Sequence, residues 1–450
     1  MKRERWGSSL GFLSAAIGSA IGIGNVWRFN YILYENGGGA FLIPYLIALL
    51  TLGIPLLLVE IWSGLWSRTS IPLIYRKINK LLEPIGWWTL INILVINIYY
   101  TAIVGWFLFY TFHSFEVVKV SDSEKFFYNF LSTNYPSLTG ALIWIFCMLI
   151  LSLGVRKGLE RFSMIFVSLM WILMLILLFR ALISPGAFDS IYKYLSVDFS
   201  KLSNWNVWIT AFGQVAFSLS IAMGIMPLFG SYLNRKKEIV PNSLATAFAD
   251  TSFSLISALT IFSFLGIVGL QPTEGFALAF FTFPLAIAEM PGKEIFSFIF
   301  FLTLTIAGFT SVLTSFEALI ASLNDKFRIP RKSAIVLLGL FLIFLTSLFA
   351  NDLNTIKFLD KITGTISLPL IALIECLIFG WLVGSTKIRN ELNKFSRIKL
   401  GIYFDISLKI ISPLVLFVLF SLGLKFITPI ELLIISLIII ISFFISFRKS

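Results

Sequence analysis

Two stretches of the sequence place polar and flexible residues inside apolar runs that could cross a membrane. The first is GSAIGIGNVWRF at residues 18–29, within a run from about 10 to 34, and the second is FSLSIAMGIMPLFG at residues 217–230. A helix that crosses a bilayer needs about 20 apolar residues. Glycines lower its stability, and an unpaired Asn25 or Arg28 in hydrocarbon is costly. We therefore expect both helices to be interrupted near their centres.

An interrupted helix exposes backbone groups that could bind ligands. Free carbonyl and N–H groups at mid-membrane depth are tolerated only where they line a polar cavity. The C-terminal ends of half-helices attract cations, and the N-terminal ends attract anions. Broken helices at matching positions of two halves are typical of transporter binding sites. Two glycine-kinked packing helices are the alternative, because small residues also mark close helix contacts.

The composition indicates an all-α polytopic membrane protein. Of 450 residues, 58% are hydrophobic and 13% are charged, with a mean hydropathy of +0.93. These values exclude an ordinary soluble domain. The single histidine, His113, lies at the end of an apolar run, and Cys147 and Cys376 lie inside such runs. An enzyme based on histidine, on a metal cluster or on a nucleophile with its base is therefore not expected.

The apolar runs predict twelve membrane-spanning helices. Most of the 35 lysine and arginine residues fall before span 1, in every second loop after it, or after the last span. Because cytoplasmic loops carry an excess of these residues, we expect both termini in the cytoplasm and the protein in the cell membrane. The distribution of the net charge of +12 then explains it as a signal that orients the helices in the membrane, and it implies no nucleic-acid partner. The spans are 10–34, 39–66, 86–113, 139–155, 160–183, 206–232, 241–270, 293–323, 333–350, 356–384, 402–426 and 429–447.

The two interrupted spans, 1 and 6, are five spans apart. Consecutive spans cross the membrane in alternating directions, so two spans that are five apart run in opposite directions. Equivalent interruptions in them therefore imply two five-helix repeats of opposite orientation. We expect one transporter domain over residues 1–450, with repeat one at about 10–183, repeat two at about 206–384 and two additional helices at about 402–447. The loop 271–292 contains an apolar segment too short to span, and we expect it to dip towards the protein as a helical hairpin.

Several separated motifs resemble the neurotransmitter:sodium symporter family. They are GSAIGIGNVWRF, ENGGGAFLIPY, GQVAFSLSIAMG, AGFTS and DKITGT, and the resemblance runs in order from Arg3 to about Glu375. It implies the LeuT fold of that family, with spans 1 and 6 broken. It also implies sodium-coupled symport of a small substrate by alternating access, with two sodium ions expected.

The resemblance implies a second sodium site between span 1 and span 8. The matching positions are Gly18, Ile21, Ala307, Thr310 and Ser311. Residues 307, 310 and 311 fall on one helical face, and hydroxyl and carbonyl oxygens suit a hard monovalent cation. Ordinary bonding of both hydroxyls to the preceding helical turn is the alternative.

For the first sodium site the resemblance implies Ala20, Asn25, Ser218 and Asp250. Most family members have Asn where Asp250 stands. In chloride-dependent members, the residues matching Tyr45, Gln214, Ser218 and Ser254 surround the anion. All four are present, but Asp250 shares a helical face with Ser254 and brings its own negative charge. The repulsion between this carboxylate and a chloride ion would be weakly screened there. We expect Asp250 to replace chloride, so that transport does not require it; a protonated, structural Asp250 is the alternative.

The resemblance also implies a substrate site. Amine-transporting members carry Asp where Gly22 stands, so a substrate here should bring its own carboxylate. An α-amino acid fits, and its side chain would be hydrophobic, either bulky aliphatic or aromatic, because Met223 and its neighbours are largely apolar and uncharged. The expected substrate-binding residues are Ala20, Gly22, Ile23, Gly24, Ile96, Tyr100, Phe217, Ser218, Ser220, Ile221, Met223 and Ser315.

Charged pairs at family-like positions are expected to act as gates. Arg28 and Asp360 match the outer pair, and Arg3 and Asp325 match the inner pair. Trp6 and Tyr232 are expected beside the inner pair. Glu60 and Glu375 are expected to be buried acids bonded to broken backbone, whereas Glu317 replaces a neutral residue without an explanation from the sequence.

Two other functions remain open at this point. One is an amino-acid carrier of the same fold that is not coupled to sodium, and the other is a membrane receptor that binds without transporting. The expected partners are an amino acid and the lipid bilayer. A monomer should suffice for transport, and the sequence does not indicate the oligomeric state.

Overall fold

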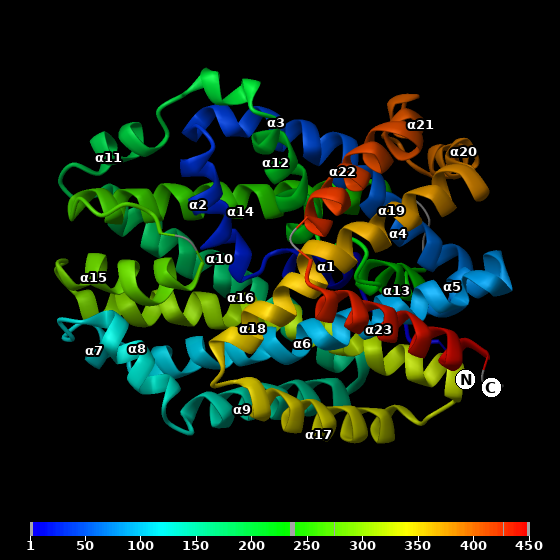
Figure 1. Ribbon diagram of the computed structural model, residues 1–450, viewed down its shortest axis with the longest axis horizontal. Coiled ribbons are helices and arrows are strands. Elements are labelled where there is room, and N and C mark those ends of the chain that lie inside the picture. Colours follow the sequence, from blue (N-terminus) through cyan, green and yellow to red (C-terminus); the bar gives the residue numbers. More distant parts are fainter. Residues whose placement is uncertain (1–2, 235–238, 274, 426, 448–450) are drawn as a thin grey trace.

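The computed structural model describes residues 3–234, 239–273, 275–425 and 427–447, apart from the side chain of residue 267. The regular secondary structure of these residues is helical, and the long helices run along one direction as a bundle (Figure 1). Lys2, residues 235–238 and residues 448–450, on which part of the charge pattern rests, lie outside the described residues. The helices that form the bundle are α1 Ser9–Ala20, α2 Arg28–Glu35, α3 Leu42–Ala48, α4 Ile54–Ser67, α6 Glu83–Phe112, α9 Tyr135–Ser152, α10 Arg161–Leu182, α12 Trp205–Ser218, α13 Ile225–Tyr232, α14 Ile239–Ile267, α16 Lys293–Phe327, α17 Arg331–Phe349, α18 Leu353–Asp360, α19 Leu368–Leu377, α22 Ser412–Leu424 and α23 Pro429–Phe447.

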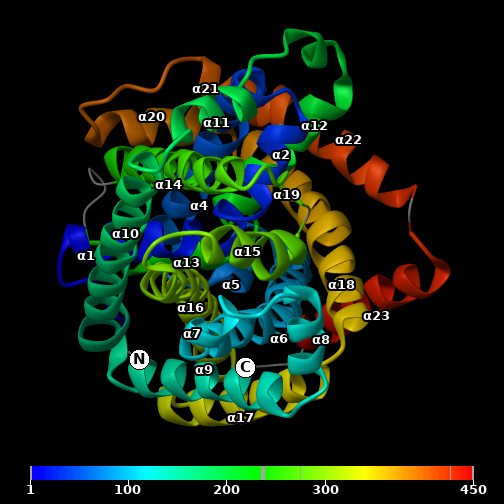
Figure 2. The ribbon, with the colours of Figure 1, turned by 90° about the vertical axis from the view of Figure 1, so that its left-hand side faces the viewer.

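Shorter helices lie at the two ends of the bundle. Figure 1 shows one group of them, α7, α8, α11 and α15, at the end opposite the marked N- and C-termini, and Figure 2 looks onto that end. These four belong to the loops 114–138, 184–205 and 271–292, which the charge pattern predicts on one side of the membrane. Which side faces the cytoplasm stays a prediction. The four helices are α7 Ser114–Val117, α8 Ser123–Leu131, α11 Ala187–Tyr194 and α15 Phe283–Ala288, and those near the other end include α5 Ile71–Ile78, α20 Ser385–Phe395 and α21 Tyr403–Ile406.

The spans agree closely with the predicted ones. Ten described helical segments are long and apolar enough to cross a bilayer, and one bent pair raises the number to eleven. Helices α12 and α13 have 14 and 8 residues, so each is too short to span alone. Twelve spans result if these two count as one interrupted span, and the number twelve stays a prediction, as do the limits of the two repeats.

Both predicted interruptions are confirmed. Helix α1 ends at Ala20, α2 begins at Arg28, and the two segments are bent by 64° relative to each other. The second break separates α12, which ends at Ser218, from α13, which begins at Ile225. Within it, Ser220 has a φ of 53°, in the left-handed region that non-glycine residues rarely adopt. The chain at this break therefore cannot continue as a regular helix.

The second half of the broken span is fixed by direct backbone packing between α13 and α4. A Cβ at Gly64 would lie 1.7 Å from the carbonyl oxygen of Pro227, and one at Gly230 would lie 2.1 Å from that of Ile61. Only glycine permits this approach, which is the role small residues commonly have between membrane helices. A buried ion pair ties the two long helices beside the break together: Lys326 Nζ of α16 lies 2.7 Å from Glu83 Oε1 of α6.

The loop 271–292 packs onto the bundle. In its described part, a π-helical turn at Leu278–Thr282 continues directly into α15, so the loop contains one short helix, Leu278–Ala288, and not the predicted hairpin. The ring of Phe280 stacks on Phe107 of α6 with centroids 4.7 Å apart, and Phe276 meets Trp27 edge-on at 5.3 Å. The apolar side chains of this loop thus cover the end of the bundle near the first helix break.

Candidate functional site

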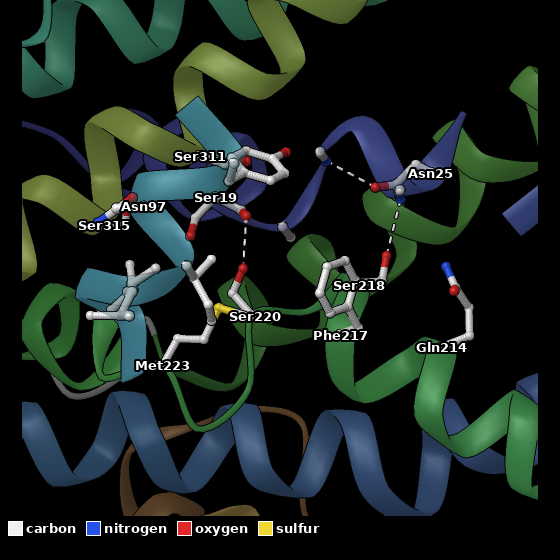
Figure 3. Close-up of a pocket in the computed structure, with 17 residues that line it drawn as sticks. Ser19, Asn25, Asn97, Gln214, Phe217, Ser218, Ser220, Met223, Ser311 and Ser315 are labelled. Atoms are coloured by element: carbon white, nitrogen blue, oxygen red, sulfur yellow. Dashed lines mark hydrogen bonds between the residues drawn. The ribbon is translucent and has the colours of Figure 1, made fainter. Parts of the chain in front are cut away.

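A cavity lies between the two helix breaks, with α6 and α16 completing its wall (Figure 3). Its empty volume is about 560 Å³. The lining residues that the structure describes carry no charge. They are Ser19, Ala20, Gly22, Gly24, Asn25, Ile93, Ile96, Asn97, Tyr100, Gln214, Phe217, Ser218, Ser220, Met223, Ile225, Ser311 and Ser315.

The first break presents its backbone to Tyr100. The N–H of Ile23 donates to the Tyr100 hydroxyl at 3.2 Å. A Cβ at Gly22 would lie 2.9 Å from that hydroxyl oxygen and 3.4 Å from Ser311 Oγ. Even an alanine at position 22 would crowd Tyr100, so the close approach of this backbone to the hydroxyl requires glycine.

Asn25 and Asp250 are the centre of a buried polar network. Asn25 Nδ2 donates to Asp250 Oδ1 at 2.7 Å and to Ser254 Oγ at 2.8 Å, and its Oδ1 accepts from the N–H of Gly22 at 2.9 Å. The Ser218 hydroxyl lies 2.8 Å from both carboxylate oxygens of Asp250. The structure thus brings Asn25, Ser218 and Asp250, predicted together from the sequence, into one cluster beside Ala20.

Of the predicted anion-site residues, Ser218 bonds the carboxylate of Asp250 directly. Ser218 and Ser254 belong to the network of Asp250, and Gln214 lines the cavity with no hydrogen-bond partner for its Oε1 among the described residues. The Tyr45 hydroxyl is 3.4 Å from Thr251 Oγ1, one residue along the chain from Asp250. One of these donors, the Ser218 hydroxyl, therefore already binds a carboxylate.

Oxygen atoms of α1 and α16 meet at the positions predicted for the second sodium site. Ser311 Oγ is 3.5 Å from the carbonyl oxygen of Gly18 and 3.3 Å from that of Ala307. Thr310 Oγ1 lies 3.0 Å from the same Ala307 carbonyl. Ile21 caps the C-terminal end of α1 in an extended conformation, with φ −73° and ψ 110°. The contacts within α16 are those of ordinary bonding to the preceding turn, whereas the contact with Gly18 joins two helices.

The second break is held by groups from two other helices, α1 and α4. Ser220 Oγ donates to the Ser19 carbonyl at 2.8 Å, which joins the two breaks directly (Figure 3). The N–H of Ala222 donates to Glu60 Oε1 of α4 at 2.6 Å. Glu375 was expected to bond broken backbone as well; its carboxyl instead lies beside that of Glu60. One of the two predicted acids therefore binds backbone directly, and the other lies behind it.

An ion pair closes the bundle at the end that carries the termini. Arg3 Nη1 contacts both carboxylate oxygens of Asp325, at 2.6 and 2.7 Å, and the N–H of Ser70 donates to the same carboxylate at 2.8 Å. The Arg3 guanidinium lies over the Tyr232 ring, 5.0 Å from its centroid. Trp6 donates from its indole to the Phe229 carbonyl at 3.0 Å. The predicted residues of this gate are thus in mutual contact.

The role of Glu317, for which the sequence offered no explanation, is visible beside this closure. Arg331 of α17 contacts both of its carboxylate oxygens, at 2.7 and 2.6 Å, and the Tyr232 hydroxyl donates to it at 2.8 Å. Glu317 is fully buried. An uncompensated charge there would be costly, so Arg331 neutralises Glu317 and the carboxylate in turn fixes Tyr232 under Arg3.

A vestibule opens on the other side of the cavity. Its empty volume is about 1700 Å³, and it shares Gly24, Tyr100 and Phe217 with the cavity below. Arg28 lies over the Phe217 ring, 5.2 Å from its centroid, and Asp360 accepts a hydrogen bond from Tyr99 at 2.9 Å. Both predicted gate residues line this vestibule, with Phe217 as part of its floor.

The structure revises the predicted wall of the cavity. Ile23 and Ile221 were expected to offer a backbone N–H and a backbone carbonyl, and they are not among the residues that line the cavity: the N–H of Ile23 donates to Tyr100, and Ile221 lines the vestibule. Asn97 lines it but was not predicted, although its place on one face of α6 with Ile96 and Tyr100 follows from helical spacing. The other lining residues that were missed are Ser19, Ile93 and Ile225.

Known proteins are similar to this chain in sequence and in fold. The model of a family described as "Sodium:neurotransmitter symporter family" matches residues 3–128 and 132–434. The chain belongs to this family. An uncharacterized sodium-dependent transporter of Methanocaldococcus jannaschii is 37% identical over 439 residues, which cover 92% of this chain and 89% of the relative. The sodium-dependent serotonin transporter of Drosophila melanogaster is 30% identical over 468 residues, covering 92% of this chain and 75% of the relative.

A solved structure agrees with the fold. The crystal structure of MhsT in complex with L-phenylalanine superimposes with a TM-score of 0.84 and 30% identity, covering 94% of this chain and 100% of that chain. Together with family membership, this confirms the predicted LeuT fold and the multi-pass membrane class. As a member of this family, the protein is therefore a sodium-dependent transporter and not an enzyme.

The closure by Arg3 and Asp325 leads to a prediction about access. Phe229 is fully buried beneath Trp6, and the native Cys147 and Cys376 are also buried. In a Phe229→Cys reporter, Asp325→Asn should speed maleimide labelling about tenfold, because a partly buried charged hydrogen bond contributes about 1.5–3 kcal/mol.

Asp405→Asn is the matched control for this experiment. It breaks the Arg389–Asp405 pair, whose side chains are 21% and 10% exposed, compared with 19% and 13% for Arg3 and Asp325. It should leave the labelling rate unchanged. Equal rates for the Asp325→Asn and Asp405→Asn proteins would show that the Arg3–Asp325 pair does not close the site.

Proposed function

We propose that the protein couples the inward movement of sodium to the uptake of a hydrophobic L-α-amino acid by alternating access. The observation that carries this proposal is the absence of an acidic side chain from the described cavity lining, with Gly22 beside the Tyr100 hydroxyl and the N–H of Ile23. An aspartate at position 22 would not fit there without displacing Tyr100. The cavity thus offers hydrogen-bond donors and no resident carboxylate, which suits a substrate that carries its own.

The rest of the cavity fits an amino acid of moderate size. Carbonyl groups of the two breaks, near Ala20 and Ser218, would accept hydrogen bonds from the substrate ammonium. The side chain would lie against Ile96, Phe217 and Met223, and Met adapts readily to different shapes. The L-phenylalanine bound to MhsT supports an amino-acid substrate, because that protein shares the fold and 30% of its residues with this chain.

Two sodium ions would occupy the two oxygen clusters. The second site would use the carbonyl groups of Gly18, Ile21 and Ala307 with the hydroxyls of Thr310 and Ser311. The first would use Ala20, Asn25, Ser218 and Asp250, with the substrate carboxylate as a further ligand. A ligand shared between ion and substrate makes the binding of each depend on the other, and this dependence would couple their movement.

Transport is proposed to be independent of chloride. Asp250 already accepts hydrogen bonds from Asn25 and from Ser218, and Ser218 is one of the groups that an anion would need. A chloride ion beside this buried carboxylate would be repelled, and a protein interior screens such repulsion weakly. Asp250 would then provide the negative charge that balances sodium.

Alternating access would use the two sides of the cavity in turn. The Arg3–Asp325 pair is closed, while the vestibule beside Arg28 and Asp360 contains about 1700 Å³ of empty space. If the termini are cytoplasmic, as the charge pattern predicts, this arrangement would admit substrate from outside the cell. A single chain contains both sides of the path, so a monomer would suffice.

The hydroxyls of α16 test the coupling to sodium. In proteoliposomes, Ser311→Ala and Thr310→Val should reduce sodium-stimulated amino-acid uptake at least tenfold, because each removes an oxygen ligand. Thr303→Val is the control: Thr303 is on the same helix and bonds only its preceding turn, at the Ile299 carbonyl.

The outcomes separate the alternatives. Uptake that proceeds equally without a sodium gradient, in wild type and in Ser311→Ala, would favour a carrier not coupled to sodium. Binding of amino acid without entry into sealed vesicles would favour a receptor. Loss of sodium stimulation in Thr303→Val as well would mean that the effect is structural.

Anion replacement tests the role of Asp250. Uptake by wild type should be the same in chloride and gluconate buffers. Asp250→Asn, which keeps the shape but removes the charge, should restore a requirement for chloride, seen as at least a severalfold higher uptake in chloride than in gluconate. Loss of wild-type uptake in gluconate would refute the proposed replacement.

A further inference from the structure

Asn97 is a buried polar residue that the proposed site does not yet use. Its side chain lies on α6, lines the cavity and is 1% exposed. Its Oδ1 accepts a hydrogen bond from Ser315 at 2.6 Å. Its Nδ2 has no hydrogen-bond partner among the described residues. A buried amide normally has its donors satisfied, so this group points to a partner supplied by the cavity.

The position of Asn97 indicates which part of the substrate it would meet. It precedes Tyr100 by three residues, which places it about 4.5 Å nearer the N-terminal end of α6. In Figure 3, Asn97 and Ser315 lie at the opposite end of the cavity from Asn25 and Gln214. An amino acid whose carboxylate lies at Tyr100 would direct its side chain towards this end.

A second unsatisfied group lines the same cavity. Ser19 Oγ is buried and also has no partner among the described residues. In contrast, Ser220 Oγ donates a hydrogen bond to the Ser19 carbonyl. The expected apolar pocket for the side chain therefore contains polar atoms whose hydrogen bonds the protein itself does not complete.

We infer that Asn97 is a specificity-determining residue that donates a hydrogen bond to an acceptor on the substrate side chain. This inference rests on the proposed function and narrows its substrate class to largely apolar side chains that carry a neutral acceptor. A thioether, as in methionine, or a phenol oxygen, as in tyrosine, supplies this chemistry. A purely apolar side chain of the same size would expel water and leave the amide unpaired, which is penalised on binding.

Matched pairs of amino acids test the inference. Competition for sodium-driven uptake in proteoliposomes compares methionine with norleucine, and tyrosine with phenylalanine. In wild type, the member with the acceptor should compete about tenfold better in at least one pair, as expected for an unsatisfied buried donor. The pair that shows the preference identifies the acceptor.

Substitution of Asn97 then assigns the preference to this residue. Asn97→Leu, which is similar in size, and Asn97→Ala should both bring the ratio within a pair to about one while uptake stays dependent on sodium. Thr101→Val, on the same helix but outside the cavity lining, is the control and should keep the wild-type ratio. A ratio of one in wild type, or an unchanged ratio in both Asn97 variants, would overturn the inference.

The experiment also separates this inference from the proposed function. If no amino acid of either pair competes for or supports sodium-driven uptake, the proposed function itself is wrong. If both members of each pair compete equally well in wild type, the proposed function stands and the role of Asn97 is refuted.

Discussion

The free peptide groups of the two broken helices are the constraint on which the rest of the structure depends. Hydrocarbon offers no hydrogen bonds, so each group must find a partner inside the protein or in a polar cavity. Side chains accept hydrogen bonds from three of the N–H groups: that of Gly22 bonds Asn25, that of Ile23 bonds Tyr100, and that of Ala222 bonds Glu60. The surrounding helices thus satisfy donors of the breaks, while carbonyl groups near Gly18 and Ala20 face hydroxyls and the cavity. Such an arrangement favours a cation as the missing partner.

Two buried acids, Glu317 and Asp250, differ in whether another charged side chain compensates their charge. Glu317 has a permanent partner, because Arg331 contacts both of its oxygens. Asp250 is equally buried, but its described hydrogen bonds come from the neutral groups of Asn25 and Ser218. A transported cation beside Asp250 would provide the compensation that Arg331 provides for Glu317. The first acid therefore stabilises the closed end of the bundle, whereas the second suits an ion that arrives and leaves.

Much of this arrangement follows from the sequence, for identifiable reasons. The breaks are visible because Gly22, Gly24 and Gly224 interrupt long apolar runs, and apolar runs in lipid otherwise form continuous helices. The cluster of Asn25 and Asp250 came from the family resemblance, as did the pairing of Arg3 with Asp325 across 322 positions of sequence. Periodicity alone contains no information about which distant charges meet.

The errors have equally physical causes. That Ile221 lines the vestibule did not follow from the sequence, because the break has left-handed residues and therefore no helical period from which to infer a side-chain direction. Asn97 was missed although its helix is regular, since a single amide within an apolar helix was given no weight. The partner of Glu317 depends on how α16 and α17 pack, which the local sequence does not specify.

The central claim is that sodium and an amino acid share one site formed by the two breaks. Equilibrium binding of radiolabelled amino acid to the purified transporter, measured over a range of sodium concentrations at constant ionic strength, tests it most directly. The account predicts that the dissociation constant falls steeply as sodium replaces choline, and that saturating amino acid tightens sodium binding by the same factor. Amino-acid binding of equal affinity with and without sodium would contradict it.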